Sequence, residues 1–106
     1  MFETVLTIGL FDKDAEKQLI SRDDARDLIA RILIDECNIF AFTMLDCAGV
    51  YRMQSTGNIV REPSIRVEIV TDENLDILPA MITRLKSVLN QETIMVKTSR
   101  ADVDFI

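Results

Sequence analysis

The sequence predicts one α+β domain, residues 1–106, in which an antiparallel sheet carries two helices on one face. A chain of 106 residues suffices for one hydrophobic core but not for two independent ones. Two segments place apolar residues at the three- and four-residue spacing of a helix, and Ile65 to Val70 alternates apolar and polar side chains. With three further β-rich stretches, the predicted order is strand, helix, strand, strand, helix, strand.

The composition excludes several broad classes. With 48% hydrophobic and 28% charged residues, the chain is typical of a soluble globular protein. The longest apolar run, Ile39 to Leu45, is far shorter than the roughly 20 residues of a membrane helix. Glu3 stands where a secretion signal would carry basic residues, so we expect a cytoplasmic location. The net charge of −6 disfavours direct nucleic-acid binding, because phosphates repel an acidic surface.

Cysteine and metal chemistry have little support. We interpret Cys37 and Cys47 as small buried hydrophobes in a reducing compartment. The chain has no histidine, so a zinc site would depend mainly on carboxylates. The polar stretch 12–20 has alternating acids, but lysines intrude and the glycine of a calcium loop is missing. We therefore expect a solvated loop, with no metal and no cofactor.

The first strand and the first helix are predicted on either side of this loop. Thr4 to Phe11 is β-branched and apolar, and Gly9 within it marks a bulge or a close approach. Ser21 has the side chain of an N-cap, so the helix begins at Arg22. Asn38 is expected to end the helix in the left-handed conformation. Its apolar stripe comprises Ala25, Leu28, Ile29, Ile32, Leu33 and Cys37.

A long β-hairpin is predicted from Asn38 to Thr71. Its turn is expected at Ser55 to Gly57, a three-residue loop with Gly57 in the left-handed position. This register places Tyr51 across from Arg61 and Asp46 across from Arg66. Sliding by one residue would pair Arg52 with Arg61, and two like charges directly opposite are destabilising. A bulge at Gly49 or a break at Pro63 would change the register.

A run of acids from Asp72 to Asp76 is expected to open the second helix at its positive end, and Pro79 must lie in its first turn. Asn90 is expected to close it. Glu92 to Lys97 is the predicted fourth strand, and Val103 to Ile106 alternates as a short extra strand would. The complete order is that of the ferredoxin-like βαββαβ sandwich. The helix stripe comprises Leu78, Met81, Ile82, Leu85, Val88 and Leu89.

The predicted sheet has one face that the helices leave open. In the expected register, three large apolar side chains share this face with Asp46, Arg66 and Glu68; they are Phe40, Phe42 and Met44. A monomer rarely leaves such a patch exposed. We therefore expect a homo-oligomer, most simply a dimer that packs sheet against sheet or edge against edge. The alternative is that the C-terminal strand folds back over the patch.

Several stretches carry a resemblance to known sequences. They are Thr7 to Leu10, Asp12 to Asp14 ending at Ile20–Ser21, Gly49–Val50–Tyr51–Arg52 through Gly57 to Glu62, and Asn90 to Met95. In them the chain resembles small uncharacterised proteins of gut Firmicutes and their phages and mobile elements. The hairpin is also similar to a wider bacterial family with a G-x-[YW]-R…G-x-I-V-[RK]-E pattern. The resemblance implies a ferredoxin-like fold and a mobile-element setting, and it implies no established activity and no catalytic residue.

One polar cluster is the candidate for a functional site. A carboxylate beside tyrosine and arginine is suited to acid–base work, and paired arginines bind anions. The same residues also suit a structural ion-pair ladder or a protein-binding surface. No histidine is present to activate a nucleophile, and no glycine-rich phosphate loop occurs, so we expect the protein not to be an enzyme. The cluster comprises Asp46, Tyr51, Arg52, Arg61, Glu62, Arg66 and Glu68.

Two hypotheses of function follow. The first is a non-enzymatic acidic module that binds another protein through its hairpin tip or an acidic helix face. One version is a phage or mobile-element inhibitor of host defence, such as an anti-CRISPR protein acting on a basic groove. The second is a small-molecule binding or sensor protein. It would hold an anion or nucleotide on the sheet face or at the oligomer junction, through Arg52, Arg61 and Arg66.

Overall fold

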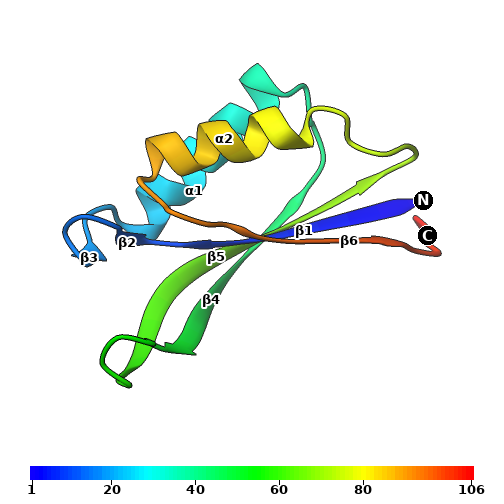
Figure 1. Ribbon diagram of the computed structural model, residues 1–106. Coiled ribbons are helices and arrows are strands. Elements are labelled where there is room, and N and C mark those ends of the chain that lie inside the picture. The colour runs from blue at the N-terminus through cyan, green and yellow to red at the C-terminus, as the bar shows by residue number, and fades with distance from the viewer.

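The computed structural model describes residues 1–106 and contains a four-stranded antiparallel sheet with both helices on one face (Figure 1). The sheet order β4-β5-β1-β6 confirms the predicted ferredoxin-like arrangement. In chain order the elements are β1 (Phe2–Gly9), β2 (Phe11–Asp12), β3 (Lys17–Gln18), α1 (Arg22–Arg31), the π-helical segment η1 (Ile32–Glu36), β4 (Thr43–Arg52), β5 (Ile59–Thr71), α2 (Leu78–Val88) and β6 (Met95–Arg100).

Strand β1 lies at the centre of the sheet, between β5 and β6. Leu6 pairs with Val67 and Ile8 pairs with Ile65, and all four side chains are fully buried beneath the helices. Side chains alternate between the two faces of a strand, so Gly9 lies on the opposite face. We call this face, which no helix covers, the open face.

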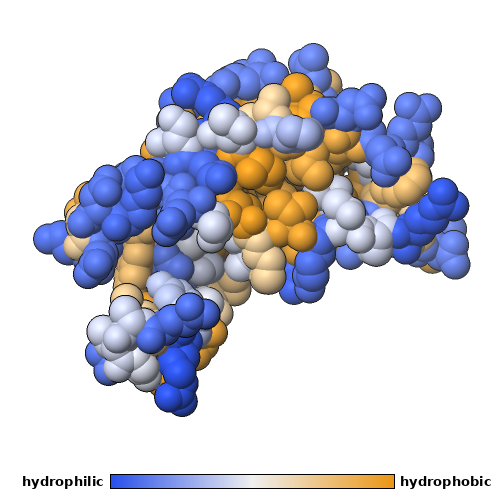
Figure 2. Space-filling model, in the orientation of Figure 1, coloured by the Kyte–Doolittle hydropathy of each residue, from blue (hydrophilic) through white to orange (hydrophobic).

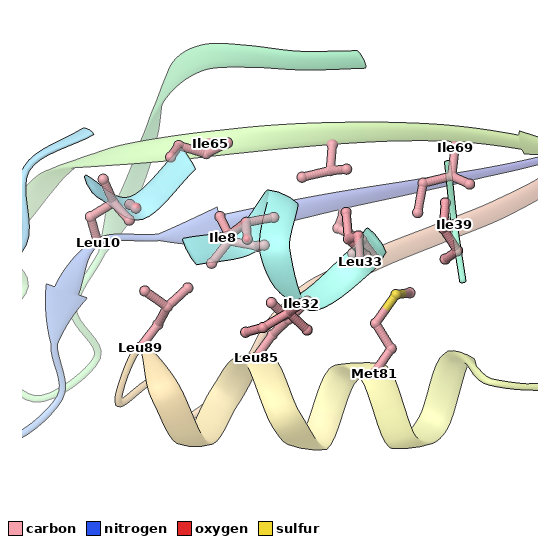
Figure 3. Close-up of a cluster of buried hydrophobic side chains, with 14 residues drawn as sticks. Ile8, Leu10, Ile32, Leu33, Ile39, Ile65, Ile69, Met81, Leu85 and Leu89 are labelled. Carbon is pink, nitrogen blue, oxygen red and sulfur yellow. The ribbon is translucent and has the colours of Figure 1, made fainter. Parts of the chain in front are cut away.

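The core fills the space between the helices and the sheet. Fourteen buried apolar residues form one cluster, to which α2 contributes Met81 and Leu85 (Figure 3). Ile32 and Leu33 reach it from η1, which confirms the second half of the predicted helix stripe. Each fully buried aliphatic side chain contributes about 1.5–3 kcal/mol, so this cluster holds the two layers together.

Helix α1 begins at Arg22 as predicted. The Ser21 hydroxyl accepts a hydrogen bond from the Asp24 amide at 3.0 Å. Beyond α1 the helix widens into η1, where the Cys37 amide donates to the Ile32 carbonyl at 3.1 Å. Asn38 then has a φ of 55°, which confirms its left-handed role. The apolar spacing did not predict the widening, because it fits either kind of helix.

The stretch predicted as one strand from Thr4 to Phe11 divides in two. Strand β1 ends at Gly9, and β2 turns away to pair with β3 in a small ribbon. Of this ribbon, Asp12 and strand β3 fall in the stretch 12–20 that was predicted as a loop. Its turn is held by Asp12, whose Oδ1 accepts hydrogen bonds from the amides of Asp14 and Ala15 at 2.9 Å each.

The register of the β4–β5 hairpin differs from the prediction by one residue. Tyr51 pairs with Val60 where Arg61 was expected, and Asp46 pairs with Ile65 where Arg66 was expected. The turn spans residues 54–57, and the Met53 amide donates to the Asn58 carbonyl at 2.9 Å across it. The turn is thus one residue longer than predicted. Gly57 has a φ of 73°, which confirms its left-handed conformation.

A shift of one residue moves every β4 side chain to the other face of the sheet. Phe42 and Met44 therefore pack against the core, and the prediction that they lie on the open face is wrong. Phe40 precedes β4 and is 74% exposed, so it is not part of a sheet-face patch either. In their place, Leu45 pairs with Arg66 on the open face.

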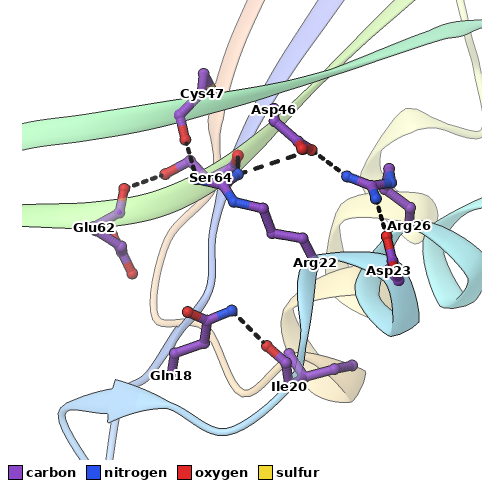
Figure 4. A network of polar contacts seen from close by, with 9 residues as sticks. All are labelled: Gln18, Ile20, Arg22, Asp23, Arg26, Asp46, Cys47, Glu62 and Ser64. Atoms are coloured by element: carbon purple, nitrogen blue, oxygen red, sulfur yellow. Dashed lines mark hydrogen bonds and ion pairs between the residues drawn. The ribbon is translucent and has the colours of Figure 1, made fainter.

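Asp46 gives the physical reason for the observed register (Figure 4). It points to the helix side, where its carboxylate bonds to Arg26 and lies 3.8 Å from the Arg22 guanidinium. Arg22 also donates to the Ser64 carbonyl at 2.6 Å and to the Cys47 carbonyl at 2.9 Å. These bonds join α1 to both strands of the hairpin in a single register.

Helix α2 begins at Leu78, so the acids from Asp72 to Asp76 precede the helix and do not open it as expected. Pro79 lies in its first turn as predicted. Asn90 ends the turn after it with a φ of 48°. Strand β6 begins at Met95, three residues after the predicted start at Glu92, and residues 101–106 form no strand. The predicted extra strand is therefore absent, and Phe105 is 83% exposed. Neither helix has the length and apolar character needed to cross a bilayer.

Candidate functional site

A pocket of about 690 Å³ lies on the open face, where β1 ends. The distal half of the hairpin bends away from the sheet below the β2–β3 ribbon (Figure 1). Residues of both the hairpin and the ribbon line the pocket. Its third wall is the turn from α2 into β6. Three stretches that are far apart in the sequence therefore meet here. We call it the Glu62 pocket, after the carboxylate that accepts a hydrogen bond from Phe11 at its edge.

Strand alternation explains why these side chains share one face. Tyr51 pairs with Val60, and Gly49 pairs with Glu62. Odd-numbered β4 residues and even-numbered β5 residues therefore point the same way, into the Glu62 pocket. Tyr51 and Glu62 are diagonal neighbours on this face. Arg61 is an odd-numbered β5 residue, so its side chain points away from the pocket, on the same side of the hairpin as its partner Val50.

The Glu62 carboxylate is held in place on two sides. Its Oε2 accepts a hydrogen bond from the Phe11 amide at 2.8 Å. The carboxylate also lies directly over Gly9, so that a Cβ at this position would overlap it. Gly49, directly across from Glu62, leaves further room on the pocket side. The sequence indicated either a bulge or a close approach at Gly9, and the structure shows a close approach by this carboxylate.

Tyr51 is the aromatic partner of Glu62 in the pocket. Burial raises the pKa of the Tyr51 phenol, and the negative charge of Glu62 raises it further. The phenol is therefore protonated near neutral pH and is available as a hydrogen-bond donor. A tyrosine that donates and a carboxylate that accepts stand side by side, an arrangement suited to binding a polar, positively charged substrate.

The ionisable side chains around the pocket are mostly acids. Four carboxylates face one ammonium group; the carboxylates are Asp12, Glu16, Glu62 and Glu92, and the ammonium is that of Lys13. Hydrogen bonds from the Ala15 amide and the Asn90 side chain lower the pKa of Asp12. The pocket therefore attracts cations. No three His, Cys, Asp or Glu side chains gather in the geometry of a metal site.

Only two of the predicted site residues, Tyr51 and Glu62, line the Glu62 pocket. Asp46 lies on the helix side, as described above. Arg66 and Glu68 pair with each other on the open face, with Nε and Oε1 3.2 Å apart. Arg52 and Arg61 share the far side of the hairpin, so the predicted anion site of three arginines does not form.

Sequence reasoning missed most of the remaining wall. Gln91 was not singled out at all, although it is the most deeply buried polar side chain of the turn that forms this wall, 8% exposed. Phe11 was assigned only to a strand, and Glu92 was assigned only to the start of one. Many lining residues fall in the stretches quoted for the resemblance, although Ile20 and Ser21 do not line the pocket, and nothing in the sequence indicated that these stretches meet.

No protein-family profile and no curated protein sequence matches the chain. Solved structures do. A phage SAM lyase in complex with S-methyl-5′-thioadenosine is 26% identical with a TM-score of 0.66, covering 92% of this chain and 79% of its own. The CutA1 protein from Thermus thermophilus is 18% identical with a TM-score of 0.66, and CutA from Archaeoglobus fulgidus is 10% identical with 0.67. Both cover 99% of this chain and 88% of their own.

The two divalent cation tolerance proteins show the fold alone. The phage lyase is an enzyme that matches nearly the whole chain, and this contradicts the expectation that the protein is not an enzyme. That expectation rested on missing histidine and on missing nucleophile motifs.

Proposed function

We propose that the protein binds S-adenosylmethionine in the Glu62 pocket and cleaves it to S-methyl-5′-thioadenosine. The observation that carries the proposal is the Glu62 carboxylate fixed beside Tyr51 in an acidic, partly aromatic pocket. The phage lyase that resembles this chain acts on the same substrate class and is bound to that product. The sequence analysis also considered a small-molecule site on the sheet face, but one that binds an anion through arginines. The pocket is lined by carboxylates and by no arginine.

The charge of the pocket suits this substrate. S-adenosylmethionine carries a sulfonium and an ammonium group against one carboxylate, so its net charge is positive. Two opposite charges 4 Å apart attract by about 1 kcal/mol in water and by about 4 kcal/mol near a protein surface. An excess of three carboxylates therefore favours the cation over a neutral adenosine compound.

The proposed reaction breaks the bond between sulfur and the γ-carbon of the methionine chain. The electron pair stays on sulfur, which becomes the neutral thioether of S-methyl-5′-thioadenosine. Without water, two co-products balance the atoms. The substrate's own carboxylate attacks the γ-carbon and gives a lactone, or a base removes the neighbouring proton and gives an alkene. Both steps neutralise charge, so a pocket less polar than water favours them.

Glu62 has a different role in each route. In ring closure its carboxylate orients the substrate by attracting the positive groups, and no proton moves to it. In elimination Glu62 is the base that accepts the proton. Mass spectrometry of the co-product separates the two routes, because the lactone and the alkene are different compounds.

The test is incubation of the purified protein with S-adenosylmethionine and quantification of S-methyl-5′-thioadenosine. We expect Glu62→Gln to lose about 100-fold or more in rate, as the loss of a positioned charged group does. Glu68→Gln is the matched control, because it changes the same residue type on the same strand and face outside the pocket. Wild-type protein that releases no thioadenosine, or equal losses in both variants, would refute the proposal.

The homo-oligomer predicted from the sequence is also proposed, with a second copy of the chain as the partner. Strand β6 is a sheet edge with an unpaired backbone, and its Met95 is 56% exposed. Figure 2, in the orientation of Figure 1, shows exposed apolar side chains between α2 and β6, next to this edge. Light scattering of the intact chain at several concentrations measures the assembly. A particle of 12.1 kDa at all of them would contradict it.

A phage or mobile-element setting is proposed on the resemblance of the sequence and on the phage origin of the matching lyase. Inhibition of host defence by an acidic protein that binds a host partner is the second candidate function. Its support is the net charge of −6 together with this setting. Affinity capture from host lysate at physiological salt tests it, and absence of a saturable host protein contradicts it.

A further inference from the structure

The turn between α2 and β6 reaches across the molecule to the residue that holds Glu62. The Gln91 side chain is 8% exposed, and its Nε2 donates to the Phe11 carbonyl at 2.6 Å. It also lies 3.3 Å from the Leu89 carbonyl of its own turn. The amide of the same Phe11 donates to Glu62 Oε2 at 2.8 Å. The Phe11 backbone therefore links the two side chains, because its carbonyl accepts from Gln91 and its amide donates to Glu62.

Asn90, the neighbouring residue, fixes the same segment from outside. Its Nδ2 donates to Asp12 Oδ2 at 2.9 Å and to Asp14 Oδ2 at 2.8 Å. Its carbonyl accepts a hydrogen bond from the Lys13 amide at 3.0 Å. Asn90 and Gln91 together therefore make hydrogen bonds to Phe11, Asp12, Lys13 and Asp14. No strand pairing joins β2 to the four-stranded sheet, so these hydrogen bonds tie residues 11–14 to the turn.

We propose that Gln91 is a positioning residue, which fixes the Phe11 backbone and thereby holds the Glu62 carboxylate over Gly9 and beside Tyr51. The catalytic part of this inference rests on the proposed cleavage of S-adenosylmethionine. A glutamate side chain has three rotatable bonds, and an exposed carboxylate would sample many directions. A bond to a fixed amide selects one of them, and bonds to a charged acceptor are about twice as strong as neutral ones.

The first test reads the position of Glu62 without any substrate. Tyr51 is the only tyrosine and the chain has no tryptophan, so the absorbance of tyrosinate reports this residue alone. Glu62→Gln should lower the pKa of Tyr51, because the Glu62 charge helps to raise it. Gln91→Met keeps the length of the side chain but removes the donor. It should lower the Tyr51 pKa in the same direction.

The double variant decides whether Gln91 acts through Glu62. In the Glu62→Gln background, Gln91→Met should cause no further change in the Tyr51 pKa, because the charge it positions is gone. Gln54→Met is the matched control, because it makes the same substitution at an exposed position of the hairpin turn that does not line the pocket. Equal shifts in both backgrounds, or none in either, would overturn the inference.

Activity gives the second readout. Gln91→Met should lower kcat about tenfold, the worth of one hydrogen bond, with little change in KM. The same substitution should have no effect in the Glu62→Gln background. If wild-type protein cleaves no S-adenosylmethionine, the proposed function fails, and the tyrosine titration still decides the positioning role.

A measurement on protein with Gln91 intact covers the case in which Gln91→Met does not fold. The Gln91 side-chain amide protons give separate nuclear magnetic resonance signals. Removing the Glu62 charge weakens the Phe11 bond and so should shift these signals in Glu62→Gln relative to wild type. An unchanged Gln91 signal in a folded Glu62→Gln protein would overturn the inference.

Discussion

Gly9 provides a prediction at the scale of a single residue. An alanine methyl group there would occupy the space of the Glu62 carboxylate, which is the flexible end of a side chain and is displaced at small cost. Gly9→Ala should therefore fold with nearly unchanged melting temperature and lose activity about as far as Glu62→Gln does, roughly 100-fold. Release of S-methyl-5′-thioadenosine and thermal unfolding measure the two effects.

Gly57→Ala is the contrasting variant. Gly57 has a φ of 73° and nothing lies within 4 Å of its open side. Alanine there is strained by the backbone alone, at a cost of about 1–2 kcal/mol. It should therefore lower stability and leave the activity of the folded protein unchanged. The opposite pattern in the two variants would show that Gly9 serves the backbone and not Glu62.

The phenol of Tyr51 predicts how stability depends on pH. Because its pKa is raised in the folded state, the unfolded chain releases this proton first as the pH rises. The contribution of Tyr51 is complete below about pH 10, the ordinary tyrosine pKa, and is lost as the pH rises through the folded value. In Tyr51→Phe, the free energy of unfolding should therefore fall less steeply with rising pH. Urea unfolding from pH 8 to 11, roughly the range that brackets tyrosine ionisation, measures this slope.

At the scale of elements, the hairpin shows how much depends on one residue of register. In the expected pairing, Tyr51 and Glu62 would point to opposite faces. In the observed pairing they share the pocket. Both registers separate Arg52 from Arg61, so the repulsion argument did not distinguish them. The longer turn and the bonds of Asp46 to α1 favour the observed one, and such tertiary contacts leave no local pattern in the sequence.

Arg22 provides the prediction at this scale. Its guanidinium joins α1 to the Ser64 and Cys47 carbonyls, where the hairpin leaves the sheet. Arg22→Met should lower the free energy of unfolding by about 2 kcal/mol, since it removes charged donors from partly buried carbonyls. Arg61→Met on the exposed far side should change it by less than about 0.5 kcal/mol. Urea unfolding compares them, and equal losses would contradict a specific role for Arg22.

For the whole molecule, the sequence predicted the architecture better than the site. Periodicity identified both helices, and the order of elements was enough for the sheet. The Glu62 pocket depends on the bend of the hairpin and on the turn at Asn90, which bring three distant stretches together. Gln91 illustrates the limit. Its role comes from one bond to a residue 80 positions away, and no spacing pattern reports such a bond.

The acidity of the whole chain leads to the last prediction. A net charge of −6, with four carboxylates around the pocket, should draw a cationic substrate from beyond contact distance. Added salt screens exposed charges over about 10 Å at 0.1 M. The kcat/KM for S-adenosylmethionine should therefore fall several-fold between low and high salt. Inhibition by neutral S-methyl-5′-thioadenosine should change little, because it has no net charge to attract. If kcat/KM for S-adenosylmethionine and the affinity for S-methyl-5′-thioadenosine fell in parallel, salt would be acting on the fold or the assembly. The carboxylates would then have no part in selecting the cation.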